Sequence, residues 1–225
     1  MATEFIIQLS LLGIVVGFAA GLLGVGGGGI LVPMLTSMYL SAEIVPSHAV
    51  HLALGTSMAS IITTTFSSAF SHYKNHNLDW TYIKAMVPLI IMGAISISFL
   101  VPFINTTFLA VFFSLFMFSI SLKLFFNKQH ISAKQTKIPP QLAGLGIGSI
   151  CYAINGHISA EELANHQGII GFVHIPSVII ISISGFLMAP VGVKLSTKLP
   201  VKVLKKIFAV LLVGLSIKML MNVLL

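Results

Sequence analysis

The chain has 225 residues, of which 56% are hydrophobic and only 8% are charged. Soluble domains carry roughly 25% charged residues, so this composition excludes an ordinary water-soluble enzyme or binding domain. The formal net charge of +7 comes entirely from lysine, and most of the lysines lie between apolar runs. This placement indicates contact with anionic lipid head groups and argues against nucleic-acid binding.

The first charge-free run, Phe5–Ala42, is much longer than the roughly 20 residues that one helical pass needs. Four consecutive glycines, Gly26–Gly29, interrupt it and are followed by Pro33. Because glycine disfavours helix by roughly 1 kcal/mol per position relative to alanine, a single straight helix is not expected here. The sequence predicts a spanning helix, a break that Pro33 fixes, and then a shorter helix.

Later apolar runs predict further spanning helices at about 49–71, 85–101, 106–126, 141–156, 168–188 and 207–225. The runs are continuously apolar, whereas barrel strands alternate, so the fold class is an all-α polytopic membrane protein with about seven passes. Lysine-rich loops around Lys74, Lys134 and Lys202 are expected in the cytoplasm, and the loop with Glu161 and Glu162 outside.

A weak internal repeat relates Thr106–Phe125 to Val201–Leu220. Identical residues recur at a constant offset, in the pairs Leu109/Leu204, Phe113/Phe208, Ser121/Ser216 and Lys123/Lys218. Duplicated halves are common in secondary transporters. The prediction is therefore one transmembrane domain over residues 1–225, with a first repeat at about 5–126, a cytoplasmic loop at about 127–140 and a shortened second repeat at about 141–225.

The glycine-rich stretch Gly17–Pro33 has two interpretations besides nucleotide binding. Gly24, Gly26 and Gly29 match a G-x-G-x-x-G pattern formally, but the pattern lacks its βαβ context. Gly13, Gly17 and Gly21 have the spacing of a helix-packing face. Gly26, Gly27, Gly28 and Gly29 are consecutive and form no single face. They are predicted to be unwound backbone that binds a substrate, or else a purely structural break.

A second polar segment lies in the predicted pass at 49–71. Gly55, Thr56 and Ser57 combine hydroxyl donors with a glycine, and neutral donors together with helix N-termini can bind an anion without a buried cation. The alternative is that such hydroxyls bond only to carbonyls of their own helix. The anion-binding interpretation makes Gly55, Thr56 and Ser57 candidate substrate-binding residues.

The remaining polar groups predict neither a metal site nor a catalytic site. The pairs His48/His51 and His72/His76 have the spacing of one helix face, but a third ligand is missing beside the first pair, and no metal site is predicted. No G-x-S-x-G elbow with a partner histidine occurs, so no catalytic residue is assigned. No cofactor is expected.

Several motifs resemble the sulfite exporter TauE/SafE family of bacterial membrane transporters. Gly21–Leu35 (GLLGVGGGGILVPML) is close to the signature of that family's first half. Further similar stretches are His48-Ala-Val, Ala53–Ser57 (ALGTS), Asn75–Trp80 (NHNLDW), Gly171–Pro176 (GFVHIP), Ala189–Gly192 (APVG) and Lys198–Pro200 (KLP). In the second half, Leu142–Ile150 runs directly into Cys151–His157, so that roughly one helical hairpin of the family pattern is missing.

The resemblance implies a secondary transporter, an exporter of small anions such as sulfite or organosulfonates, in the bacterial inner membrane. The alternative is a transport-incompetent member of the family, or one that needs a partner to complete its site, because of the missing hairpin. Expected partners are a small anionic substrate and membrane lipids. The oligomeric state is left open.

Overall fold

The computed structural model describes residues 2–23, 27–73, 88, 92–93, 95–96, 100–126, 168–196 and 201–224. The predicted pass at 141–156, most of the pass at 85–101, Gly26, and the loops around Lys74, Lys134 and Glu161 fall outside these residues. The described helices are α1 (Ala2–Leu23), α2 (Gly28–Ser41), α3 (Ala49–Tyr73), α5 (Thr106–Phe126), α8 (Ile175–Ser196) and α9 (Val201–Leu224). Short 3-10 turns at Pro46–His48 and Val101–Phe103 precede α3 and α5.

The described part of the chain is an all-α membrane fold. Four of its helical stretches are long and apolar enough to cross a membrane: Thr3–Leu22, Pro46–Ser67, Thr106–Phe126 and Ile175–Ser196. The predicted passes at 49–71 and 106–126 coincide closely with α3 and α5. Seven passes and two repeats go beyond what these helices establish.

The first apolar run is two helices, as predicted, because α1 ends at Leu23 and α2 begins at Gly28. Gly27 precedes α2 with a φ of 72°, in the left-handed region that favours glycine. Pro33 lies inside α2, where the missing N–H removes one hydrogen bond near the helix start, so the structure places the break at glycine and not at Pro33.

Two helix boundaries in the last third of the chain differ from the prediction. The pass expected at 168–188 begins only at Ile175, because residues 168–174 form the antiparallel strands β1 (Ile169–Ile170) and β2 (Val173–His174). Gly168, directly before β1, and Gly171, in the tight turn between the strands, both have positive φ. Hydropathy detects these apolar residues but not their backbone conformation.

Helix α9 starts at Val201, six residues before the expected start at 207. Lys202, Lys205 and Lys206 therefore belong to its first two turns and not to a loop. Lysine has good helix propensity, and long lysine side chains near a helix end reach the membrane interface, so charge alone did not mark the true boundary.

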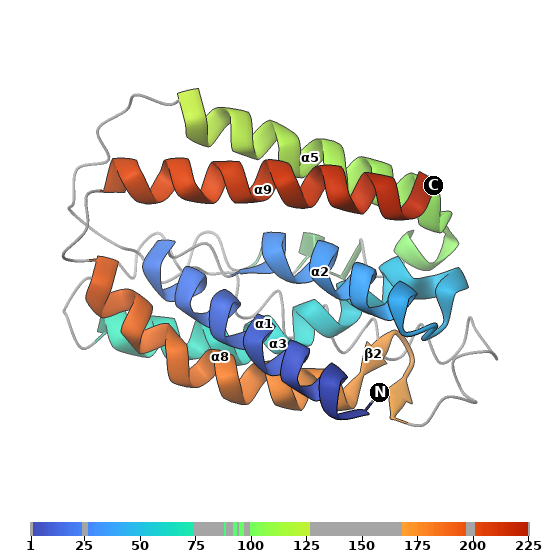
Figure 1. Cartoon of the computed structure of the whole chain (residues 1–225), viewed down its shortest axis with the longest axis horizontal. Coiled ribbons are helices and arrows are strands. Elements are labelled where there is room, and N and C mark those ends of the chain that lie inside the picture. The colour runs from blue at the N-terminus through green and yellow to red at the C-terminus, as the bar shows by residue number, and fades with distance from the viewer. Residues whose placement is uncertain are drawn as a thin grey trace.

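The helices form two groups with α2 between them (Figure 1). Helices α1, α3 and α8 pack together, while α5 and α9 lie side by side and run in opposite directions. Helix α2 contacts α3 in one group and α9 in the other.

The contact between α1 and α8 depends on the predicted glycine face. A Cβ at Gly17 would overlap the backbone of Gly185, and one at Gly21 would overlap the Ala189 carbonyl. From the other side, a Cβ at Gly192 would overlap the Phe18 carbonyl. Gly13, Gly17 and Gly21 are thus packing glycines that let two helix backbones touch.

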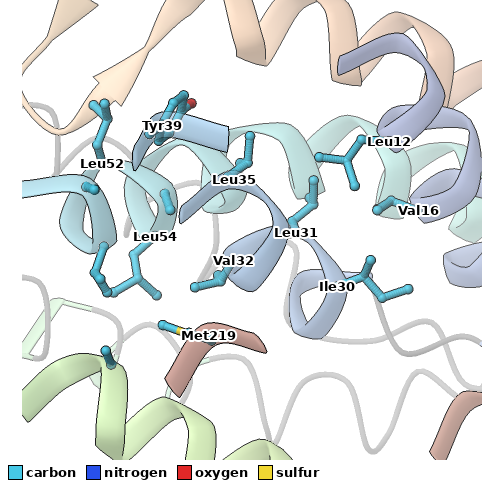
Figure 2. Packing of buried hydrophobic residues seen from close by; sticks show 14 of the residues in the cluster. Leu12, Val16, Ile30, Leu31, Val32, Leu35, Tyr39, Leu52, Leu54 and Met219 are labelled. Carbon is cyan, nitrogen blue, oxygen red and sulfur yellow. The ribbon is translucent and has the colours of Figure 1, made fainter. Parts of the chain in front are cut away.

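The apolar core follows α2. Figure 2 shows Leu12 and Val16 of α1 and Met219 of α9 on opposite sides of this helix. Leu31 and Leu35 of α2 are fully buried among them. Exposed apolar residues are concentrated on the outward sides of the other helices, as expected where lipid replaces water: Ile7, Leu11, Phe108, Phe112, Ile183, Leu187 and Val210.

Candidate functional site

The helix break lies where four other helices meet. A Cβ at Gly27 would contact Val16 of α1, and one at Gly28 would contact only the end of the Ile61 side chain of α3. Gly29 faces Met117 of α5 and Leu212 of α9. Three of the four predicted glycines are therefore gathered at the centre of the bundle, and Gly26 lies outside the described residues.

The start of α2, at this central position, has backbone donors without helical partners. The Gly27 carbonyl accepts the N–H groups of Ile30 (3.0 Å) and Leu31 (3.1 Å). The first N–H groups of an α-helix, here those of Gly28 and Gly29, have no partner within the helix. Together with the helix dipole they favour a negative charge at this end of α2.

Gly55, Thr56 and Ser57 are buried on α3, but not at the level of the break. Thr56 precedes Ile61, the α3 neighbour of Gly28, by five residues, which is roughly 7.5 Å along the helix axis. Ser57 donates to the Leu54 carbonyl of its own helix (2.9 Å). The structure thus separates the two predicted parts of the site into two layers along α3.

The layer around Thr56 contains residues that the sequence did not single out. The Thr56 hydroxyl oxygen accepts the backbone N–H of His174 at 3.0 Å, and His174 Nδ1 is 2.7 Å from the Ser177 hydroxyl. The Tyr39 ring packs edge-on against the His174 ring, with 5.8 Å between centroids. Helices α2, α3 and α8 and strand β2 therefore meet in one buried polar cluster: Tyr39, Thr56, His174 and Ser177.

Tyr39 is the unsatisfied member of this cluster. Its hydroxyl is within reach of the Ser177 and Thr56 hydroxyls, but its geometry completes no hydrogen bond, although the side chain is fully buried. A buried hydroxyl without a partner is unfavourable by about 1–3 kcal/mol. Burial also lowers the pKa of His174 from its ordinary value of 6.5, which favours the neutral ring. The cluster offers neutral polar groups, as an uncharged lining for an anion would.

Of this cluster, the sequence analysis singled out only Thr56. Tyr39 lies in a short apolar helix where its hydroxyl is not conspicuous, and His174 is the last residue of a β-hairpin that hydropathy does not reveal. Only a three-dimensional contact brings them to Thr56. His174 does fall in the GFVHIP motif, but a motif match assigns no role to the ring.

The first histidine pair has structural contacts. His51 Nε2 is 3.2 Å from the Val101 carbonyl, and its Nδ1 is 3.4 Å from the Thr106 hydroxyl. The rings of His48 and His51 both pack near Phe172. Among the described residues, no group of three or more His, Cys, Asp or Glu side chains converges on a metal-sized position. The side chains of the second pair, His72 and His76, lie outside the part of the chain that the structure describes.

Comparison with known proteins identifies the family to which the chain is similar. The model of the sulfite exporter TauE/SafE family matches residues 9–156, about two thirds of the chain. A probable membrane transporter protein of Haemophilus influenzae is 25% identical over 258 aligned positions, covering 96% of this chain and 98% of the relative. One from Methanocaldococcus jannaschii is 28% identical and covers 90% of this chain and 91% of the relative.

A shorter match reaches higher identity. Probable membrane transporter protein YdhB of Bacillus subtilis is 38% identical over 74 residues, which cover 33% of this chain and 26% of the relative. No solved structure matches this chain. Because the family model covers well over half of the sequence, the chain belongs to the sulfite exporter TauE/SafE family, whose relatives found here are named as membrane transporters.

Proposed function

We propose that this protein carries small anions, with sulfite and small organosulfonates as the substrate class, across a bacterial inner membrane. The observation that carries the proposal is the start of α2 at the centre of the bundle: Gly27 is left-handed, and the N–H groups of Gly28 and Gly29 have no partner within the helix. Family membership supports transport as the activity. Backbone donors at a helix N-terminus suit a monovalent or divalent oxyanion.

The two polar layers would lie along one transport path and bind the anion in turn. Gly27, Gly28 and Gly29, with Gly26, would hold the anion at the break, and the layer of Gly55, Thr56 and Ser57 would be a second station. The Thr56 oxygen accepts from His174 but keeps its own proton for donation. Tyr39 has a hydroxyl that is already desolvated and without a partner. A buried donor of this kind gains a hydrogen bond when an anion binds. This gain favours the bound anion over the anion in water.

We also propose seven passes and two inverted repeats as the full architecture. Helices α5 and α9, which contain the sequence pairs Phe113/Phe208 and Ser121/Ser216, run antiparallel beside each other (Figure 1). The Ser121 hydroxyl donates to the Ala209 carbonyl at 2.7 Å. Antiparallel placement of matching helices is what inverted repeats produce.

The test is flux in vesicles that contain purified protein. Wild-type protein should move labelled sulfite, and Gly28→Leu should abolish this flux, because a side chain would block the approach of the anion to the backbone. Gly214→Leu is the matched control, since a Cβ at Gly214 would meet nothing within 4 Å. Full activity of Gly28→Leu would contradict the site, and an inactive Gly214→Leu would show that the assay reports on folding.

A second candidate function rests on a separate observation. The alignment with the Haemophilus influenzae relative spans 258 positions, more than the 225 residues of this chain, so tens of positions of the relative have no counterpart here. A chain that lacks a hairpin would be transport-incompetent alone, or would need a partner to complete its path. Wild-type vesicles that move neither sulfite nor a small sulfonate would favour this second function.

A further inference from the structure

A groove of about 520 Å³ lies between α1, α2 and α9 and is not part of the site described above. Its wall is mostly apolar, with side chains from all three helices. The lining residues are Gln8, Leu11, Leu12, Val15, Ile30, Met34, Ser37, Met38, Ser41, Leu211, Leu215 and Lys218. Leu11 and Val15 are also about half exposed on the outside of α1, so the groove is open toward the position of the membrane lipid.

The polarity of the groove changes along its length. On α1 the polar residue Gln8 lies nearer the N-terminus and Val15 farther from it. The two chain termini and the end of α2 lie at the same end of the bundle (Figure 1). On α2, Ser41 is therefore on the same side as Gln8, and on α9 so is Lys218, while the opposite end is apolar on all three helices.

Lys218 is the one cation among the lining residues, and none of these residues is acidic. It lies six residues before the end of α9, which is roughly 9 Å inside the helix terminus. Its side chain is exposed. In the pass proposed above at about 207–225, a lysine at this depth is unfavourable unless its side chain reaches the interface or meets an anion at the membrane surface.

We propose that this groove binds one anionic phospholipid of the surrounding bilayer. The phosphate pairs with Lys218 and accepts a hydrogen bond from Gln8, and one acyl chain lies along the apolar end toward Ile30. The Ser41 hydroxyl donates to the Ser37 carbonyl (2.8 Å) and adds polarity at the same end of the groove. The positive charge of Lys218 favours an anionic ligand. The change from polar to apolar residues along the groove favours an amphiphilic molecule over a small ion. The lateral opening admits a lipid directly from the membrane.

Native mass spectrometry of the purified protein tests the proposal. With phosphatidylglycerol and phosphatidylcholine of equal chain length, wild type should retain phosphatidylglycerol preferentially. Lys218→Gln should reduce that preference about fivefold, the effect expected of one lysine near a membrane surface. Lys218→Arg should preserve it. Lys123→Gln is the matched control, because Lys123 is also exposed near the end of a spanning helix but does not line the groove.

A second variant tests the contribution of the acyl chain separately from that of the head group. Leu215→Trp should fill the groove and lower lipid retention while Lys218 remains. Equal retention of the two lipids by wild type, or an unchanged preference in Lys218→Gln, would overturn the proposal. Displacement of the lipid by millimolar sulfite would assign Lys218 to a small anion instead. A dimer that excludes lipid would assign the groove to a second copy of the chain.

Discussion

Glycine serves two different purposes in this protein, and the difference separates packing from binding. Along the contact of α1 with α8, a Cβ at Gly17 would overlap the backbone of Gly185, which cannot move aside. At the break, a Cβ at Gly28 would meet only the tip of the flexible Ile61 side chain. Packing explains the first glycine completely. It does not explain the second, which leaves room for a role in contact with a ligand.

The largest effect is expected in the contact of α1 with α8. Gly17→Leu should lower the free energy of unfolding by about 3 kcal/mol or more, because overpacking against a backbone cannot be relieved by a rotamer change. Thermal unfolding in detergent, followed by circular dichroism, measures this. Gly214→Leu introduces the same side chain into open space and should leave the midpoint nearly unchanged. Equal midpoints for the two variants would end the packing interpretation.

An intermediate effect is expected within the break itself. Gly27→Ala should destabilise by about 1–2 kcal/mol, because a left-handed residue with a Cβ is strained. Gly28→Ala should stabilise the fold slightly, since alanine exceeds glycine in helix propensity by up to about 1 kcal/mol. Chemical unfolding in detergent distinguishes these opposite signs. Destabilisation by Gly28→Ala would show that the position is a packing glycine after all.

The same contrast between structural and binding roles applies to the hydroxyls beside the break. Thr56→Val removes the acceptor of the His174 N–H and should lower the free energy of unfolding by about 1 kcal/mol. Tyr39→Phe removes a hydroxyl without a partner, so stability should remain equal or increase. If Tyr39 contacts the anion, Tyr39→Phe should nevertheless slow sulfite flux. A variant that is less stable but fully active would contradict that role.

The smallest effect is a pH dependence from His174. Because burial lowers its pKa in the folded state, the unfolded chain binds the proton more readily as the pH falls below 6.5. Stability should therefore be highest above pH 6.5 and decrease toward pH 5. His174→Asn should reduce this slope. An identical slope in wild type and His174→Asn, measured from unfolding midpoints between pH 5 and 7.5, would assign the dependence to other groups.

The sequence predicted the helical class, the break near Gly27 and the packing glycines, because each depends on local composition or spacing. It did not predict where α8 begins, since the hairpin at 168–174 is as apolar as a spanning helix. It also did not bring Tyr39 and His174 to Thr56, because that cluster depends on how α2, β2 and α3 meet. The substrate-binding role of the glycines and of Thr56 stays a prediction.

The close backbone contact of α1 with α8 has a consequence for biosynthesis. Helix α1 leaves the ribosome well before α8, its partner, which is complete only at Ser196. At about 5–20 residues per second, the glycine face of α1 waits on the order of ten seconds or longer for α8. During that interval another helix or an insertion factor must cover this face, or lipid must fill it. Nascent chains that stall before Ser196 should therefore be recognised as incomplete and degraded.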